Sequence, residues 1–100
     1  MGRRRDLTEK YNGWANYETW CVNLWLTNEQ VNYEEAREIC LGEEDEYKGQ
    51  EALKDYVEEG TSDEIDHLGS NAFAGMISDI FRANLHVVDW AEIWKGLREE

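Results

Sequence analysis

Carboxylates are the most abundant chemistry-bearing groups of this 100-residue chain, and most of them lie in one stretch. Residues 28–66 hold fifteen of the 23 Asp and Glu residues, against Arg37, Lys48 and Lys54 as basic residues. This stretch therefore carries −12 of the formal net charge of −13. A charged lobe of this kind attracts basic surfaces and repels nucleic acid over distances comparable to the Debye length.

The pattern gives no support to catalysis by these carboxylates. An enzyme needs a nucleophile with a base, carboxylates paired in a pocket, or a set of metal ligands. The chain has no nucleophile elbow and no glycine-rich phosphate loop. We therefore expect a protein that is not an enzyme and that binds no cofactor.

A calcium loop is the metal site that an acidic run suggests first. Aligning Gly49 with the invariant glycine of an EF-hand places Glu44, Glu46 and Lys48 at the first, third and fifth positions. Lys48 cannot ligate a cation, so the alignment fails. The two cysteines and two histidines also lack the spacing of a zinc site. We expect no metal site.

Cys21 and Cys40 are expected to be buried free thiols on apolar helix faces. A disulfide is disfavoured because no apolar signal-peptide region follows the first ten residues. The chain also lacks the roughly 18 to 20 consecutive apolar residues of a membrane span. These features favour the cytoplasm and a protein without a membrane partner.

The apolar pattern predicts an all-α fold, a single small domain of about five short helices with an aromatic-rich core. With no proline in the chain, Asn, Gly, Ser and Asp must mark the helix ends. Residues 1–10 are expected to form a mobile tail and residues 11–100 the domain. The expected helices cover about 17–26, 32–41, a segment centred on 52–57 that ends before Gly60, 71–83, and a segment that follows Asp89.

The sequence contains turn and N-cap signals that mark the starts of the first two expected helices. Asn12-Gly13 is a turn signal, and Asn16 is a candidate N-cap for a helix with an apolar, aromatic face. In the second helix, Asn32 and Glu35 resemble a capping box, and Gly42 suits a left-handed C-cap. Val31 is placed to staple onto Ala36. The expected buried face of the first helix is Tyr17, Trp20, Cys21, Leu24 and Trp25, and that of the second is Tyr33, Ala36, Ile39 and Cys40.

The last two helices show the same periodicity. Ser70 is placed to open the fourth helix, and Asp89 with Glu92 forms another pair that resembles a capping box. The fourth helix is expected to bury Phe73, Ile77, Ile80, Phe81 and Asn84, and the fifth to bury Trp90, Ile93, Trp94 and Leu97.

The run Asn12-Gly13-Trp14-Ala15-Asn16-Tyr17-Glu18-Thr19-Trp20 resembles a family of small acidic proteins from phages, plasmids and prokaryotic genomes that share an N-G-W-x-N-Y-E-T-W segment. Val88-Asp89-Trp90-Ala91-Glu92-Ile93 is similar to the start of that family's C-terminal helix. The resemblance implies a mobile-element origin and a place in the evasion of host defence, without a known activity. From its residue types alone, the first run is expected to be chiefly a folding element: a capped helix with core aromatics.

Clustered acid and this resemblance together lead to the main hypothesis. The chain is expected to mimic nucleic acid and to occupy the basic groove of a host nucleic-acid-binding defence enzyme, as anti-restriction and anti-CRISPR proteins do. The partner would be a basic host protein, and the chain would not bind nucleic acid directly. The carboxylates expected at phosphate-like positions are Glu34, Glu38, Glu43, Glu44, Asp45, Glu46, Glu51, Asp55 and Glu58.

The clustered acid is also compatible with two roles that involve no mimicry. One is a non-catalytic interaction or regulatory module that docks on a basic protein, with homo-oligomerisation through exposed aromatics as one form. The other is a solvated acidic face with no specific partner, as in a halophilic protein. Halophilic adaptation should spread acid over the whole surface, whereas here residues 67–100 carry only −2.

Overall fold

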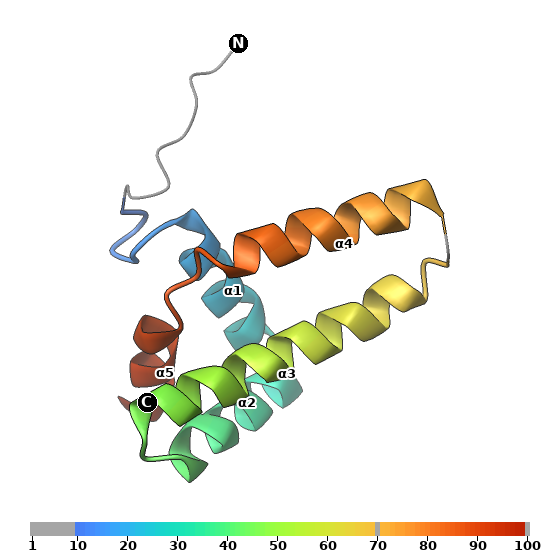
Figure 1. Cartoon of the computed structure of the whole chain (residues 1–100). Coiled ribbons are helices and arrows are strands. Elements are labelled where there is room, and N and C mark those ends of the chain that lie inside the picture. The colour runs from blue at the N-terminus through green and yellow to red at the C-terminus, as the bar shows by residue number, and fades with distance from the viewer. Residues whose placement is uncertain (1–9, 70, 100) are drawn as a thin grey trace.

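Five helices make up the part of the chain that the computed structural model describes, residues 10–69 and 71–99, and no strand occurs in these residues. The expected all-α domain of five helices is confirmed. The expected tail lies outside the described residues, apart from Lys10. In chain order the helices are α1 (Tyr17–Asn28), α2 (Gln30–Gly42), α3 (Glu46–Asp66), α4 (Ala72–Leu85) and α5 (Trp90–Glu99) (Figure 1).

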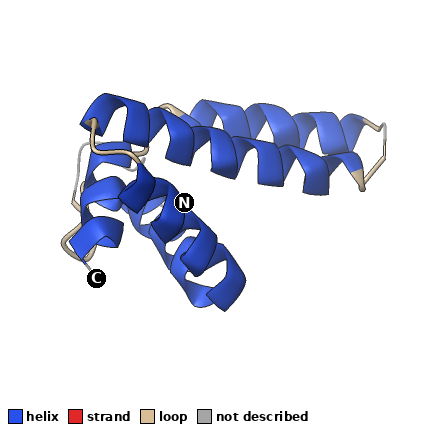
Figure 2. Cartoon of the chain, turned by 90° about the horizontal axis from the view of Figure 1, so that it is seen from below, coloured by secondary structure: helices blue, strands red, loops and turns tan. Residues whose placement is uncertain are grey.

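α5 is the central packing element, since it contacts α1, α2 and α3. α1 packs on α2, and α2 packs on α3, while α4 has its main contacts with α3. Figures 1 and 2 show the joined ends of α3 and α4 projecting away from the other three helices. The end of α3 and the start of α4 therefore have few neighbours.

The hydrophobic core gathers where α5 meets the other helices. The predicted buried face of α5 is confirmed, because Trp90, Ile93, Trp94 and Leu97 are all buried. Trp90 and Trp94 are the aromatic members of a cluster that is otherwise aliphatic or small, so an aromatic-rich core is not confirmed. The buried cluster consists of Leu26, Ala36, Cys40, Leu53, Leu85, Val88, Trp90, Ile93, Trp94 and Leu97.

A buried polar network joins the start of α1 to the start of α5. The side-chain Oδ1 of Asn16 accepts hydrogen bonds from the Thr19 backbone N–H at 2.9 Å and from the Thr19 hydroxyl at 2.6 Å. The Asn16 amide donates to the Val87 carbonyl oxygen at 2.6 Å. The Thr19 hydroxyl in turn accepts from the Asp89 backbone N–H at 2.8 Å. Asn16 is therefore the N-cap predicted from the sequence and also a link to a segment 71 residues away.

Glu92 extends this link to the predicted turn. Asn12 and Gly13 both have positive φ, 48° and 85°, and Tyr11 and Trp14 exchange two backbone hydrogen bonds across them. The next N–H, that of Ala15, donates to the Glu92 carboxylate at 2.8 Å. Glu92 therefore completes only half of a capping box: its own N–H bonds to Asp89, whereas its carboxylate serves the turn.

The predicted aromatic buried face of α1 is wrong. Thr19 and Leu26 are buried, whereas Tyr17 is 40% exposed and Trp25 is 62% exposed. The polar network explains the difference, because holding the Thr19 hydroxyl against Asp89 turns the apolar stripe toward the surface. Tyr17 and Trp20 instead stack with Tyr11 in a cluster whose ring centroids are 4.9 to 5.6 Å apart.

Both predicted ends of α2 are also wrong. The helix begins at Gln30, because Glu29 alone separates it from α1, and its first turn has no side-chain cap. Val31 is exposed and therefore does not staple onto Ala36. Gly42 stays helical, since the Arg98 guanidinium donates to the Cys40 carbonyl at 2.7 Å and caps this end from α5.

α3 continues through Gly60, where the sequence predicted its end. Asp45 caps its start by accepting from the Lys48 N–H at 2.9 Å, and the helix then runs for 21 residues. A glycine costs an α-helix about 1 kcal/mol relative to alanine. This cost does not end a long helix whose next residues, from Thr61 to Asp66, can continue its hydrogen bonds.

The predicted buried face of α4 is wrong as well. Asn71 caps the helix through the Ala74 N–H at 2.9 Å, while Ser70, the expected opener, lies outside the described residues. Ala74 and Leu85 are the residues that α4 buries. Since α3 is its main neighbour, only a narrow stripe of α4 is covered. Of the residues expected inside, Phe81 is partly buried, and the exposed ones are Phe73, Ile77, Ile80 and Asn84.

No described helix is both long enough and apolar enough to cross a membrane.

Gly49 allows α3 to approach α5 closely, and this contact can be tested. A Cβ at Gly49 would overlap the Trp94 indole, so Gly49→Ala should destabilise the protein by about 1 to 3 kcal/mol. Gly60→Ala is the matched control in the same helix, since no atom lies within 4 Å of its Cβ. It should stabilise the protein by about 0.5 to 1 kcal/mol. Urea unfolding measures both, and effects of the same sign would contradict the packing described.

Because of the buried network, we predict that loss of the Asn16 cap lowers the stability of the protein more than loss of the Asn71 cap. Asn71→Ala removes one exposed cap and should cost about 1 kcal/mol. Asn16→Ala also leaves the buried Thr19 hydroxyl and the Val87 carbonyl short of a partner, so it should cost about 2 to 4 kcal/mol. Thermal and urea unfolding compare the two variants. Equal losses would show that the network adds nothing to capping.

Candidate partner-binding surfaces

The nine carboxylates singled out in the sequence lie on α2, on the loop after it and on residues 46–58 of α3, and none of them is buried. α2 and α3 pack against each other, so these residues belong to neighbouring elements. We call this set the acidic surface: Glu34, Glu38, Glu43, Glu44, Asp45, Glu46, Glu51, Asp55 and Glu58.

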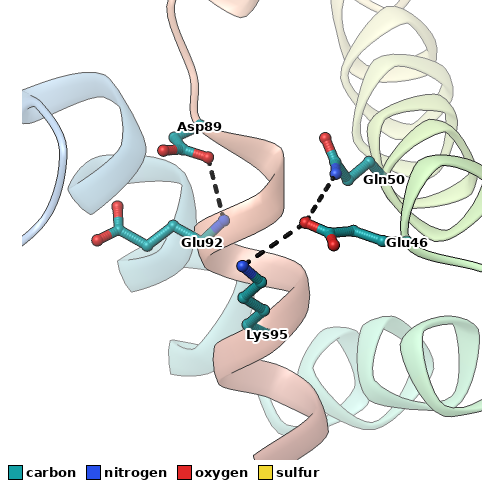
Figure 3. Close-up of polar contacts among 5 residues, drawn as sticks. All are labelled: Glu46, Gln50, Asp89, Glu92 and Lys95. Atoms are coloured by element: carbon teal, nitrogen blue, oxygen red, sulfur yellow. Dashed lines mark hydrogen bonds and ion pairs between the residues drawn. The ribbon is translucent and has the colours of Figure 1, made fainter.

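Three members of the acidic surface also have structural contacts that the sequence pattern did not reveal. Asp45 caps α3, and its own N–H donates to the Glu43 carboxylate at 3.2 Å. Glu46 lies 3.6 Å from the Lys95 ammonium and accepts a long hydrogen bond from Gln50 (Figure 3). The Glu46–Lys95 pair is half exposed, so it contributes at most about 1 kcal/mol.

Acidic residues continue along α3 past Gly60, where the sequence pattern had predicted the end of the helix. Glu59 and Asp63 join Asp55, Glu58 and Ser62 around a shallow hollow of about 370 Å³. Glu59 and Asp63 were therefore missed as members of this charged region. The signal was present in the sequence as an unbroken i, i+4 spacing of acids across Gly60.

The charge spacing along α3 resembles that of one DNA strand. Residues 51–66 contain seven carboxylates, and at about 1.5 Å per residue they extend over about 22 Å, roughly one charge per 4 Å. A DNA strand carries one charge per about 3.4 Å of axis. By the helical period, five of the seven lie on one side of α3, at roughly one charge per 5 to 6 Å of axis on that side. They are Glu51, Asp55, Glu58, Glu59 and Asp66.

A groove of about 890 Å³ opens between α1, α2, α3 and α4. Its walls are largely apolar and include the exposed Trp25 and the half-buried Val57 and Phe81. The described residues that line it include three glutamates, Glu18, Glu35 and Glu64, and no Lys, Arg or His. The groove is therefore suited to an apolar group that carries a positive charge.

Tyr56 connects α3 to α2 at the wall of this groove. Its hydroxyl donates to the Glu35 carboxylate at 2.7 Å. Burial raises the pKa of Tyr56 to about 12, and the hydrogen bond and charge of Glu35 act in the same direction. Tyr56 is therefore protonated at neutral pH and keeps donating to Glu35.

Both cysteines are free, as predicted. Cys21 is half-buried and lines the groove, whereas Cys40 is fully buried in the core. Burial raises the pKa of the Cys40 thiol to about 11, against the opposing effect of the Arg98 charge. Cys40 is consequently a packing residue rather than a nucleophile.

No three His, Cys, Asp or Glu side chains within residues 10–69 and 71–99 gather in an arrangement that would hold a metal ion. His67 ends α3, where its ring Nδ1 lies 2.7 Å from the Asp63 carbonyl oxygen. His86 ends α4 and is exposed. The two histidines therefore cap helices at separate points of the fold.

The fold and these surfaces define a small all-α protein with an acidic α2–α3 surface and an apolar groove. The chain belongs to DUF7249, a family of unknown function whose model matches residues 7–95. Comparison with curated proteins and with solved structures found no match.

Proposed function

We propose that this chain is a non-catalytic inhibitor encoded by a mobile element such as a phage. It binds the basic groove of a host nucleic-acid-binding defence enzyme, in the manner of anti-restriction and anti-CRISPR proteins, and excludes DNA or RNA from it. The observation that carries the proposal is the series of seven carboxylates along α3. None of them is buried, and their average axial spacing, taken around the whole helix, is close to the roughly 3.4 Å of a DNA strand.

Exposure and charge of the α2–α3 region support this function. Thirteen of the fifteen carboxylates in residues 28–66 are exposed and none is buried. The affinity of a basic groove for a phosphate backbone depends more on the density of charge along the groove than on any single contact. Several carboxylates therefore share the binding, and no single one is essential.

The apolar groove adds a second kind of contact with the same basic partner. A Lys or Arg side chain can lay its aliphatic stem on Val57 and Trp25 and place its charge near Glu64. A DNA backbone presents no apolar groove of this size to a Lys or Arg stem, so the groove would help the inhibitor to outcompete the nucleic acid that it mimics.

The main alternative is a module that docks on a basic protein away from any nucleic-acid site. Both functions use the acidic surface, and both predict binding that weakens as salt rises. Only mimicry predicts that the captured partner exchanges this chain for DNA.

Charge reversal on α3 tests the mimicry. The test variant is Glu51→Lys with Asp55→Lys, and the matched control is Asp79→Lys with Glu99→Lys; all four residues are exposed, and each pair adds +4. Partners captured from a bacterial lysate are isolated, and displacement of labelled DNA from them is followed by fluorescence anisotropy. The α3 variant should displace DNA at least roughly tenfold less well at about 0.1 M salt, with little change in the control.

Two results would contradict the proposal. One is a captured partner that binds DNA equally well in the presence of a saturating amount of the chain. The other is an equal loss for both double variants, which would indicate a net-charge effect without a defined surface. Circular dichroism on each variant verifies that the helices are retained.

A further inference from the structure

A seam of exposed apolar residues runs along α4. Phe73, Ile77, Ile80 and Asn84 follow one another at spacings of four, three and four residues, so they lie on one side of the helix. Phe73 is 75% exposed, Ile77 47% and Ile80 56%. We call these four residues the α4 seam. This spacing is that of the a and d positions of a helix that packs against a second helix.

α3 does not cover the seam. The residues that α4 buries, Ala74 and Leu85, lie about a quarter of a turn away from it by the helical period. Met76 flanks the seam and is 55% exposed, which widens the apolar surface. Large apolar side chains that are exposed next to one another on a small protein are typical of an interface.

The charge distribution indicates what covers the seam. α4 contains one acid, Asp79, and one base, Arg82, so the helix is neutral on a molecule of net charge −13. By the helical period both charged residues lie on the far side of α4 from the seam. A basic partner is drawn to the acidic α2–α3 surface instead. Two copies of this chain repel each other through their acidic surfaces, and the uncharged seam is a face through which they can meet.

The order of residues in the α4 seam also allows it to pack against the α4 seam of a second copy of the chain. When two α4 helices pack antiparallel about a twofold axis, Ile77 of one copy faces Ile80 of the other, and Phe73 faces Asn84. Each apolar residue of one copy then has a counterpart in the other, as an isologous interface requires. A helix of 14 residues is about 21 Å long, so the interface lies near the lower limit of stable ones, about 1,000 to 1,200 Å² in total.

We infer that two copies of this chain associate through the α4 seam, with the two helices antiparallel about a twofold axis. The dissociation constant is expected in the micromolar range, given the size of the interface. The dimer should tighten as salt rises, because salt screens the repulsion between the acidic surfaces and favours apolar contact. This inference is independent of the proposed function, for which the salt dependence has the opposite sign.

Sedimentation equilibrium of the full chain tests the association, between about 5 and 500 μM protein and at about 0.1 and 0.5 M NaCl. The unaltered chain should dimerise, more tightly at the higher salt. Ile80→Asp should raise the dissociation constant by at least about thirtyfold. Val31→Asp is the matched control on α2, since Val31 is a similarly exposed β-branched residue and receives the same charge.

A chain that stays monomeric over the whole range would overturn the inference, and this result would be expected if a different protein covers the seam. An equal shift by Ile80→Asp and Val31→Asp would overturn it too. Circular dichroism on both variants separates loss of the dimer from loss of α4.

Disulfide trapping tests the antiparallel arrangement in a Cys21→Ser background, which leaves only the buried Cys40. The variants Ile77→Cys and Ile80→Cys are oxidised separately and as a mixture. The mixture should give mainly the cross-linked pair of unlike chains, because Ile77 of one copy faces Ile80 of the other. Faster cross-linking of each variant with itself would contradict the antiparallel packing.

Discussion

The hydrogen bonds around Asn16 and Thr19 are the constraint on which the rest of this structure depends. They fix the start of α1 to the segment before α5, although the two are about 70 residues apart in the sequence. Because Asn16 and Thr19 are buried, their polar side-chain atoms need partners, and the observed placement of α1 beside the start of α5 provides them. These residues and their partners belong to the segments 12–20 and 87–93, and both segments therefore have a structural role in the fold.

Other parts of the molecule remain available for binding. α5 receives the core contacts of α1, α2 and α3, and Arg98 holds the end of α2 in place. The outer sides of α2 and α3 and the exposed side of α4 are not needed for this packing. They carry the two surfaces that differ most from an ordinary protein exterior, one strongly acidic and one apolar. Apart from Glu43, Asp45 and Glu46, which have contacts within the fold, the proposed binding residues are separate from those that hold the core together.

The sequence predicted the number of helices, the caps at Asn16 and Asp89 and the buried side of α5, because local periodicity and capping determine these features. The prediction from sequence failed where a residue far along the chain determines a helix end or the rotation of a helix. Arg98 caps α2 where Gly42 was expected to, and Thr19 sets the rotation of α1 against its aromatic periodicity. The exposed side of α4 could not be foreseen, since periodicity shows that a helix has an apolar face without showing what covers it. All nine carboxylates of the acidic surface were predicted from the sequence. Their continuation along α3 was missed because the helix was predicted to end before Gly60, although the i, i+4 spacing of acids runs across it.

The proposed function requires that the acidic surface is kept for a partner and is not neutralised within the molecule. Like charges held close together reduce stability, and salt screens them: the Debye length falls from about 30 Å at 0.01 M to about 3 Å at 1 M. The most direct measurement is therefore the free energy of unfolding in urea as NaCl rises over this range, at a fixed protein concentration. We predict a clear rise in stability with salt, larger for the natural chain than for the variant with Glu51→Lys and Asp55→Lys. A fall in stability with salt would show that internal ion pairs hold these carboxylates and would contradict the proposed role of this surface.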